Sequence, residues 1–371
     1  MRIRSLSWCR YRIPLSAPFA TAHGALTERR GLLLRLETDA GVIGLGEAAP
    51  LPGFGGDVDA AEAALRSLVP LIVGLPVAQV SEVLDRLPRD EPGMAAARCA
   101  LDVAALDAEG QAAGLPVAAL LAPEWAGVVP VNATVGAPLL DDAVAAAQAA
   151  VAAGFRCVKL KVGVAGSLAG EVGRIAGVHA ALPDGVALRL DANGAWSHDE
   201  ALAVLRAVAP LGIELIEQPV APGDLAGLAR VRAAGLVPVA ADEAVTSLEA
   251  AEHIVALAAA DVLVIKPMLA GGLRRGRAIV ELAHAAGLHT IVTTTIDSGV
   301  GVAAALHLAA TLPAPPLACG LDTRSLLAGD LVSGLPPVVA GSLHLPDGPG
   351  LGVMLGEAGC GGAPASARFG R

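Results

Sequence analysis

The feature that most constrains the fold of this chain is a regular alternation that begins near residue 128. Short apolar runs recur there, and Ala-rich segments with helical spacing, such as 141–153 and 198–209, separate them. Because those segments have the length of crossover helices, the runs should form parallel strands with right-handed connections. The runs are eight in number and cover 129–135, 157–162, 187–191, 212–217, 237–242, 261–266, 289–294 and 316–321. They predict an α/β fold with a TIM-type (β/α)7β barrel over 126–334, whose active site lies at the carboxyl ends of the strands.

The first 125 residues follow another pattern. Strands are predicted at 1–15, 31–37 and 42–47, with a turn at 39–41 that makes a hairpin of the last two. Helical patterns follow at 58–73 and 93–113. We therefore expect an N-terminal α+β capping domain over 1–125, completed by part of 335–357. The Gly- and Ala-rich segment 358–371 is expected to be a mobile tail.

Composition limits the classes of partner. The formal net charge is −10, with 26 basic against 36 acidic residues, so the chain lacks the electrostatic footprint of a nucleic-acid-binding protein. Apolar stretches are interrupted before they reach the roughly 20 residues of a membrane span. The five cysteines show no Cys-x-x-Cys pair, so neither a disulfide framework nor a zinc site is predicted. We expect a cytoplasmic protein without nucleic-acid or membrane partners, and a homo-oligomer is compatible with the sequence.

Three acidic residues each stand at the end of a predicted strand: Asp191, Glu217 and Asp242. Glu217 follows Asp191 by 26 residues and Asp242 follows Glu217 by 25, so one strand–helix repeat separates each pair. In a barrel this spacing brings the carboxylates side by side at the rim that holds the active site. A single strand-end acid often does no more than cap the next helix. Three in phase predict an all-oxygen site that suits Mg²⁺, with Mn²⁺ as the alternative.

Three lysines bracket these acidic residues. Lys159 and Lys161 alternate along one run, so both side chains should point into the barrel. Lys266 ends the run 261–266 and should face Lys161 across the metal. A lysine becomes a base when neighbouring cations and a desolvated site lower its pKa. Such a site can remove the proton α to a carboxylate, because a metal and an ammonium group stabilise the enediolate. A base on one face gives elimination, and bases on both faces permit epimerisation.

At these positions the chain resembles the muconate lactonising subgroup of the enolase superfamily. The resemblance rests on Lys-x-Lys at 159, Asp-Ala-Asn at 191, Glu-Gln-Pro at 217, Asp-Glu at 242 and Ile-Lys-Pro at 265, and it spans nearly the whole chain. It implies that the three acids hold the metal, that Lys161 abstracts the α-proton, and that Lys266 stabilises the enolate or acts as a second base. It also implies supporting roles for Lys159 and Asn193, and a capping domain whose early loops close over the site.

Segments 50–54, 265–267, 297–301 and 320–323 narrow the resemblance within that subgroup. In them the chain is most similar to the o-succinylbenzoate synthases. Dipeptide epimerases usually carry Asp-x-Asp at the last strand end, where the first acid binds a substrate ammonium group. This chain has Gly-Leu-Asp there, beginning at Gly320. The turn that begins at Asp297 can instead offer backbone donors to an anion, such as a succinyl carboxylate. The expected substrate-binding residues are Asn193, Thr21, Phe54, Asp297, Ser298, Gly299, Gly320 and Leu321.

The resemblance implies a lyase of menaquinone biosynthesis. It would dehydrate 2-succinyl-6-hydroxy-2,4-cyclohexadiene-1-carboxylate to o-succinylbenzoate by syn elimination, with a small carboxylate as substrate and a lysine as base. Three alternatives stay open at this point. They are an N-succinylamino acid racemase or dipeptide epimerase, a muconate cycloisomerase, and a non-catalytic metal-binding barrel.

Overall fold

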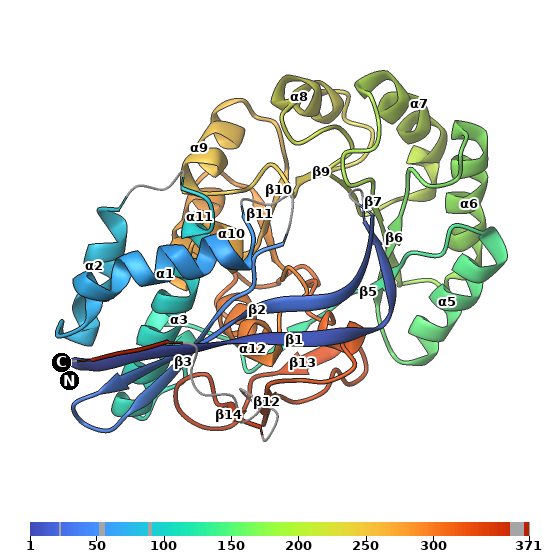
Figure 1. Ribbon diagram of the computed structural model, residues 1–371. Helices are drawn as coiled ribbons and strands as arrows, with labels where there is room; N and C mark the ends of the chain where they lie inside the picture. The colour runs from blue at the N-terminus through green and yellow to red at the C-terminus, as the bar shows by residue number, and fades with distance from the viewer. Residues whose placement is uncertain (22–23, 52–55, 88–90, 357–366, 371) are drawn as a thin grey trace.

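The computed structural model describes residues 1–21, 24–51, 56–87, 91–356 and 367–370. Figure 1 shows an N-terminal sheet with helices beside a curved arrangement of strands and outer helices. The larger of two hydrophobic clusters spans both parts of the molecule. The smaller cluster includes Leu215, Ala240, Val262, Val264 and Ile291. These residues come from neighbouring parallel strands, so this second cluster fills the barrel.

The N-terminal domain is an antiparallel sheet covered by helices. Its strands are β1 (Ile3–Thr21), β2 (Gly24–Thr38) and β3 (Ile43–Ala48), and its helical elements are α1 (Val58–Ile72), η1 (Val77–Gln79), α2 (Val80–Asp85), α3 (Met94–Ala113) and α4 (Val117–Leu121). Helix α3 lies directly on β3. A Cβ at Gly44 or Gly46 would overlap the carbonyl oxygen of Ala104 or Ala100, so glycine permits this close approach.

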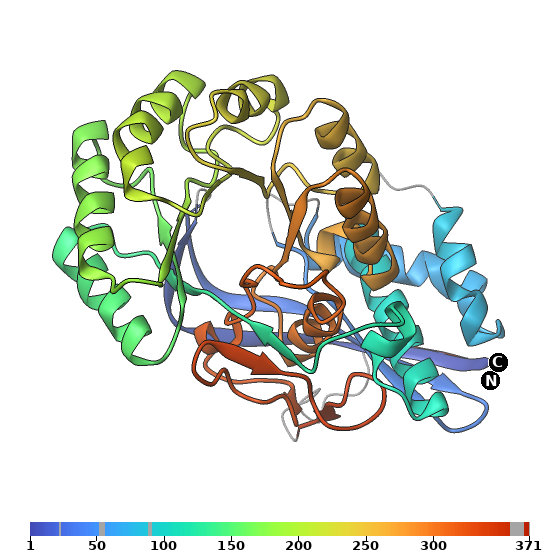
Figure 2. The ribbon, with the colours of Figure 1, turned by 180° about the vertical axis from the view of Figure 1, so that it is seen from behind.

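Strands β1 and β2 are longer than the sequence predicted, since β1 continues past residue 15 and β2 begins at Gly24. Their far ends extend toward β6 and β7 of the barrel (Figures 1 and 2). The hairpin therefore links the capping domain to the region where the acidic strand ends lie.

Seven parallel strands form the barrel sheet in the order β11-β10-β9-β8-β7-β6-β5. They are β5 (Ala133–Val135), β6 (Cys157–Lys161), β7 (Ala187–Asp191), β8 (Leu215–Glu217), β9 (Val239–Ala241), β10 (Val262–Ile265) and β11 (His289–Val292). The helical elements between and after them are α5 (Leu140–Ala152), α6 (Leu168–Ala181), α7 (His198–Val208), η2 (Ala209–Leu211), α8 (Leu225–Ala233), α9 (Leu248–Ala256), α10 (Pro267–Ala270), α11 (Leu273–Ala285) and α12 (Gly299–Ala309). Side-chain caps begin several of them, including a capping box between Ser197 and Glu200 at α7.

The eighth predicted run, 316–321, forms bridges instead of a strand. Cys319 bridges to Val131 and Gly320 bridges to Thr293, both in parallel. The amide of Gly320 donates to the Val292 carbonyl at 2.9 Å, and the amide of Asn132 donates to the Cys319 carbonyl at 3.0 Å. This run thus joins the two edges of the sheet. The predicted α/β fold with a capping domain and a barrel is confirmed.

The C-terminal segments return to the start of the chain. They are η3 (Arg324–Leu326), β12 (Val332–Ser333), β13 (Ser342–His344), β14 (Met354–Leu355) and β15 (Ala367–Gly370); β13 pairs with β4 (Val128–Pro130) and β12 with β14. Leu351 donates its amide to Asp107 of α3 at 2.8 Å. This contact joins the segment 335–357 to the capping domain.

Two expectations, one about the end of the chain and one about the cysteines, need correction. Residues 367–370 were expected in a mobile tail, but they form β15, which pairs antiparallel with β1. The edge of β1 offers unpaired backbone groups, and an extended segment of suitable length can bind them. The rest of 358–371 lies outside the described residues. Cys9 is disulfide-bonded, which cysteine spacing did not indicate, whereas Cys99, Cys157 and Cys319 are free.

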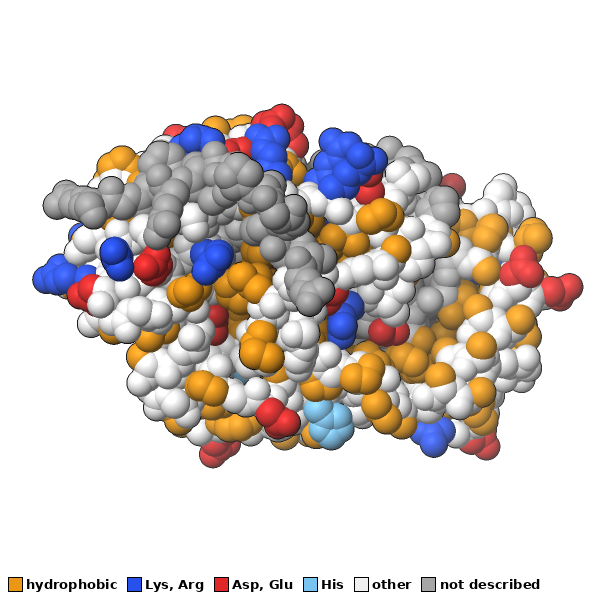
Figure 3. Space-filling view, turned by 60° about the horizontal axis from the view of Figure 1, so that its bottom comes forward, with side chains coloured by type: hydrophobic (Ala, Val, Ile, Leu, Met, Phe, Trp, Pro, Cys, Tyr) orange, Lys and Arg blue, Asp and Glu red, His pale blue; other side chains and the backbone are white. Residues whose placement is uncertain are grey.

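Within the described part of the chain, no helix is both long and apolar enough to cross a membrane. On the face in Figure 3, charged side chains are scattered among apolar and neutral ones.

Candidate active site

The three predicted metal ligands come together at the carboxyl ends of neighbouring strands. Asp191 is the last residue of β7 and Glu217 the last of β8, and the two are paired in register. Asp242 follows β9 directly. All three side chains are buried. The spacing of one repeat therefore places these acids in one layer of the barrel, as the sequence indicated.

All three predicted lysines contact this layer. The amine of Lys159, Nζ, lies 2.9 Å from both Asp191 Oδ2 and Glu217 Oε1. Lys161 lies 2.6 Å from Asp191 Oδ2 and 2.7 Å from Asn193 Oδ1, and Lys266 contacts Asp242. With 21% of its side chain exposed, Lys161 is the most accessible of the three, against 13% for Lys159 and 9% for Lys266.

These residues are also the only lysines in the chain. All the remaining basic residues among the 26 Lys and Arg are arginines. Counting the lysines in the sequence would have pointed to these three positions. A surface cation can be either residue, but a proton-transferring amine requires lysine, because arginine stays charged. The distribution supports a chemical role for these three positions.

Burial and charge together perturb the acidic residues. Burial and the neighbouring Asp191 together raise the pKa of Glu217 to about 7, against the opposing effect of Lys159. Burial also raises the pKa of Asp242. For Asp191, burial is outweighed by Lys159 and Lys161, which hold its pKa well below the usual range.

The lysines respond in the opposite sense. Burial alone would lower the pKa of Lys159, but Asp191 and Glu217 outweigh it and raise the pKa well above its ordinary value. Burial alone would also lower the pKa of Lys266, but the charge of Asp242 outweighs burial and raises that pKa. Each carboxylate therefore has a lysine amine as its ion-pair partner.

The acidic set fits a hard divalent cation by its chemistry. All three donors are carboxylates, they stand on adjacent strands, and burial makes their negative charges unfavourable without a cation. Within the described residues, no three His, Cys, Asp or Glu side chains are already arranged as a metal shell.

Residues just after strands β7 and β8 form hydrogen bonds that hold the acids and lysines of the site in place. Asn193 and Gln218 both have left-handed backbone, with φ of 45° and 38°. The Asn193 amide group donates to Glu243 at 2.8 Å, while its oxygen accepts from Lys161. The side-chain oxygen of Gln218 accepts the amide of Asp242 at 3.0 Å. Gln218 and Glu243 were not predicted as site residues, although each directly follows a predicted ligand in sequence.

The predicted substrate-binding residues lie in different surroundings in the structure. Asn193 lies beside Lys161, as expected for a residue at the site. Gly320 lies against Thr293, whose hydroxyl donates to the Gly320 carbonyl at 2.8 Å, and Leu321 is buried. Thr21 ends β1, and only its backbone is described. Phe54 lies outside the described residues.

The turn at Asp297, Ser298 and Gly299 differs from our expectation. Its backbone donors were expected to bind a substrate anion, but protein carboxylates already accept them. Glu47 of the capping domain accepts the Ser298 amide at 3.0 Å, and Asp330 accepts the Gly299 amide at 2.8 Å. The start of a helix attracts negative charge, and here a buried side chain supplies it in place of a ligand. This correction removes the main argument for a succinyl-binding site at α12.

Glu47 has further partners at the junction of the two domains. Its second oxygen accepts the Ser298 hydroxyl at 2.7 Å and the Gly301 amide at 2.8 Å, and Tyr11 also donates to this carboxylate. Asp297 is 2% exposed and accepts from the Thr295 hydroxyl at 2.5 Å. Burial and the nearby Glu47 together raise the pKa of Asp297 to about 7. Asp297 and Glu47 therefore belong to the domain junction.

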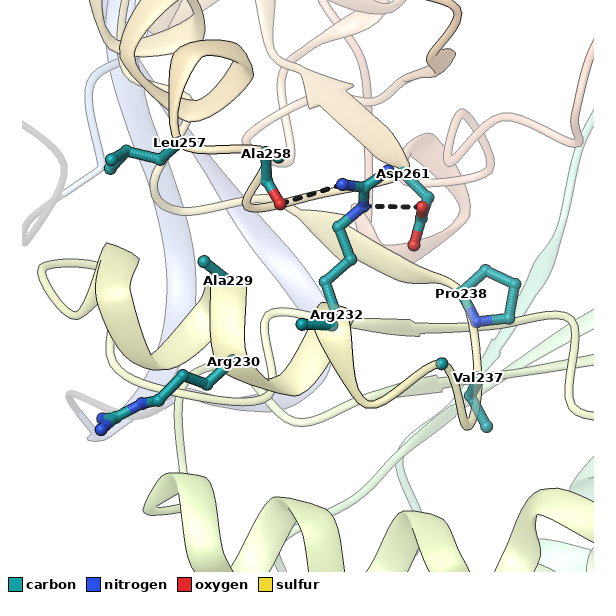
Figure 4. A pocket seen from close by; sticks show the side chains of 10 residues that line it. Ala229, Arg230, Arg232, Val237, Pro238, Leu257, Ala258 and Asp261 are labelled. Atoms are coloured by element: carbon teal, nitrogen blue, oxygen red, sulfur yellow. Dashed lines mark hydrogen bonds and ion pairs between the residues drawn. The ribbon is translucent and has the colours of Figure 1, made fainter.

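A surface cavity of about 580 Å³ lies elsewhere, between α8 and α9. Figure 4 shows Arg232 at its wall, paired with Asp261 at 2.8 Å and donating to the Ala258 carbonyl. Val237 and Asp261 precede β9 and β10, so this cavity is at the amino ends of the strands. It is separate from the layer of acids and lysines.

Two family models together match most of the chain. Residues 5–122 match the N-terminal domain of the mandelate racemase / muconate lactonizing enzyme family, and residues 142–358 match the enolase C-terminal domain-like family. The chain therefore belongs to the enolase superfamily, among its mandelate racemase and muconate lactonizing enzymes.

Particular relatives narrow the comparison. L-Ala-D/L-Glu epimerase of Bacillus subtilis (strain 168) is 31% identical over 95% of this chain and 97% of its own. The solved N-succinyl Arg/Lys racemase from Bacillus cereus ATCC 14579 has a TM-score of 0.91 and 25% identity, covering 100% of this chain and 99% of its own. The dipeptide epimerase from Enterococcus faecalis V583, complexed with Mg and L-Leu-L-Tyr, has a TM-score of 0.87 and 27% identity, covering 95% and 99%. These relatives are isomerases, so they do not support the lyase class that we expected.

Proposed function

We propose that this protein is an isomerase that inverts the α-carbon of an N-acylated amino acid, with one lysine removing the α-proton and a second lysine delivering a proton to the opposite face. The observation that carries the proposal is the placement of Lys161 and Lys266. Lys161 ends β6 and Lys266 directly follows β10, and the three acidic strands β7, β8 and β9 lie between these two strands in the sheet. A substrate held over the acids would therefore have one amine on each side.

The roles follow from this placement. Lys161 takes the α-proton from one face of the substrate, and Lys266, in its ammonium form, returns a proton to the other face. A divalent ion held by Asp191, Glu217 and Asp242 would neutralise these carboxylates and supply positive charge for the substrate carboxylate. Lys159 keeps Asp191 and Glu217 together, and Asn193 holds the Lys161 amine through its side-chain oxygen.

Gly320 favours a substrate whose nitrogen carries no charge. Without a side chain, this position offers no carboxylate to a substrate ammonium group. Its neighbour Thr293 is uncharged and uses its hydroxyl on the Gly320 carbonyl. An acylated, neutral nitrogen suits these surroundings better than the free amine of a dipeptide. The similarity to N-succinyl Arg/Lys racemase supports the same choice.

Dehydration to o-succinylbenzoate is the second candidate. Its first half, removal of an α-proton by Lys161, uses the same acids and lysines. It ranks lower because the relatives described above are epimerases and a racemase, whereas the loss of α12 as an anion site affects a succinyl group in either candidate.

A panel of substrates in heavy water with Mg²⁺ tests the proposal. It contains N-succinyl and N-acetyl amino acids, dipeptides, cis,cis-muconate, and 2-succinyl-6-hydroxy-2,4-cyclohexadiene-1-carboxylate. We expect deuterium at the α-carbon and inversion of configuration for the N-acylamino acids. Aromatic product from the cyclohexadiene, without α-exchange in the amino acids, would establish dehydration instead. No turnover across the panel would favour a non-catalytic barrel.

A further inference from the structure

The loop that follows Lys161 is held by one buried carboxylate. Three consecutive backbone amides, those of Gly163, Val164 and Ala165, donate to a single oxygen of Glu171 at 2.9, 2.9 and 3.1 Å. Successive amides that converge in this way form a binding site for an anion, and here a side chain of α6 is that anion. Glu171 is 2% exposed. The loop is therefore fixed to α6 by charge-assisted hydrogen bonds.

The other oxygen of Glu171 binds Arg174, one turn further along α6. Arg174 Nη2 and Nε donate to Glu171 Oε1 at 2.8 and 3.1 Å, and Arg174 is also 2% exposed. The same guanidinium donates to the backbone carbonyl of Lys161 and, at 3.0 Å, to that of Ala137 in the loop after β5. It thus contacts the main chain of Lys161 itself.

We propose that Glu171 and Arg174 are positioning residues that fix the main chain of Lys161, and so hold its amine where it can reach the substrate α-carbon. This inference rests on the proposed function for the role of Lys161. Neither residue is part of the acidic layer, and neither contacts Asp191, Glu217 or Asp242 in the described hydrogen bonds and ion pairs.

Geometry explains why Lys161 requires such support. It is the last residue of β6, so its carbonyl lies where the strand leaves the sheet. Lys159 and Lys161 both pair with β7, opposite Arg189 and Asp191, but the strand continues on both sides of Lys159 only. Arg174 supplies a partner for the Lys161 carbonyl at this point. A lysine side chain is long and flexible, so a small movement of its main chain displaces the amine further.

The chain is suited to a direct test, because its three lysines give only three lysine side-chain signals. Protein labelled with ¹³C at lysine Cε is compared by NMR among the wild type, Glu171→Gln and Arg174→Gln, neither of which adds a lysine. Gln keeps the size of Glu without the charge. Arg174→Gln removes the guanidinium that reaches the Lys161 carbonyl, so it provides a second variant if the first fails to fold.

We expect both substitutions to shift or broaden the Lys161 signal and to leave the Lys266 signal in place. Hydrogen exchange at the amides of 163–165 should become faster. The matched control is Glu281→Gln, which breaks an exposed pair with Arg277 on α11 at 3.0 Å and should change no lysine signal. An unchanged Lys161 signal in both variants would overturn the proposal.

Kinetic measurements then distinguish a role in positioning Lys161 from a general role in the stability of the fold. On any N-acylamino acid that the wild type racemises, we expect turnover to fall about 10- to 100-fold with KM within about threefold, because the amine is misplaced while binding is retained. The deuterium isotope effect on turnover should increase. Turnover and isotope effect equal to the wild type would also overturn the proposal. If the wild type racemises nothing, the proposed function fails, and the Lys161 signal still decides whether Glu171 and Arg174 hold this residue.

Discussion

At the scale of single residues, the site divides into groups that the sequence identified and groups that it did not. The three acids and the lysines were identified because one repeat separates each acid and because strand alternation fixes side-chain direction. Glu47 was missed. It lies far from α12 in sequence, and only the packing of the capping domain on the barrel brings it to Ser298.

The two lysines should have separable roles. We predict that Lys266→Ala abolishes inversion by about 10²-fold or more, while α-proton exchange persists in the enantiomer that presents its proton to Lys161. Lys161→Ala should show exchange in the opposite enantiomer only. Chiral chromatography with mass spectrometry in heavy water measures both quantities. Equal loss of exchange from both enantiomers in each variant would argue against a two-base mechanism.

Asp297 should make stability depend on pH. Its pKa in the folded protein is about 7, against an ordinary value of 3.8, because it is buried beside Glu47. The folded state thus binds a proton that the unfolded state releases between these values. Its contribution to stability is complete below about pH 4 and is lost as the pH rises through 7, to the extent of about 4 kcal/mol.

The test replaces the protonated acid by a neutral amide. Asp297→Asn should match the wild type in melting temperature near pH 4 and exceed it at pH 8. The groups around Asp297 that also carry or can acquire charge are Glu47, Tyr11, Arg29 and Cys99. Asp184→Asn, at an exposed position, is the control and should follow the wild type. Parallel melting curves for Asp297→Asn and the wild type at all pH values would refute the assignment.

At the scale of elements, periodicity located the barrel strands to within a few residues, because alternating crossover helices leave a regular pattern. It could not show that the last run, 316–321, would form only bridges. Short segments at the closing edge of a sheet depend on how the two edges meet, which is a tertiary property. The extent of β1 and β2 was missed for a similar reason, since their far ends lie over the barrel and not within a local sheet (Figure 1).

The contact between α3 and β3 leads to a prediction about stability. Gly46→Ala places a methyl group against the Ala100 carbonyl, so we expect destabilisation of about 1–3 kcal/mol from overpacking. Denaturant unfolding measures this difference. Gly223→Ala is the control, because no atom lies within 4 Å of the added Cβ. Similar unfolding midpoints for the two variants would contradict the tight packing described for this helix.

At the scale of the whole molecule, the site is formed by the barrel, and the capping domain fastens to its rim. Arg29 joins them, since its guanidinium donates to the Ile296 carbonyl at 2.9 Å and to the Ala49 carbonyl at 2.7 Å. Composition and periodicity indicated two domains, but such contacts between distant segments cannot be read from local pattern. They also changed the predicted substrate site, because Glu47 occupies donors that had seemed available.

Metal binding should stabilise the folded molecule. A ligand that binds only the folded state at about 100 times its Kd adds about 2.7 kcal/mol, so Mg²⁺ should raise the melting temperature. Asp191→Asn should largely remove this increase, whereas Glu281→Gln should retain it. A melting temperature independent of Mg²⁺ and Mn²⁺ would count against the proposed metal site.

The most direct test of the central claim is the fate of the α-proton. Each enantiomer of an N-succinylamino acid is incubated with the protein and Mg²⁺ in heavy water, and deuterium at the α-carbon is followed together with configuration. We predict that both enantiomers incorporate deuterium and converge on a racemic mixture. Lys161→Ala should lower the rate of deuterium incorporation by at least about 10²-fold for one of the two enantiomers. Retention of the α-proton in both enantiomers across a range of amino-acid side chains would contradict the account.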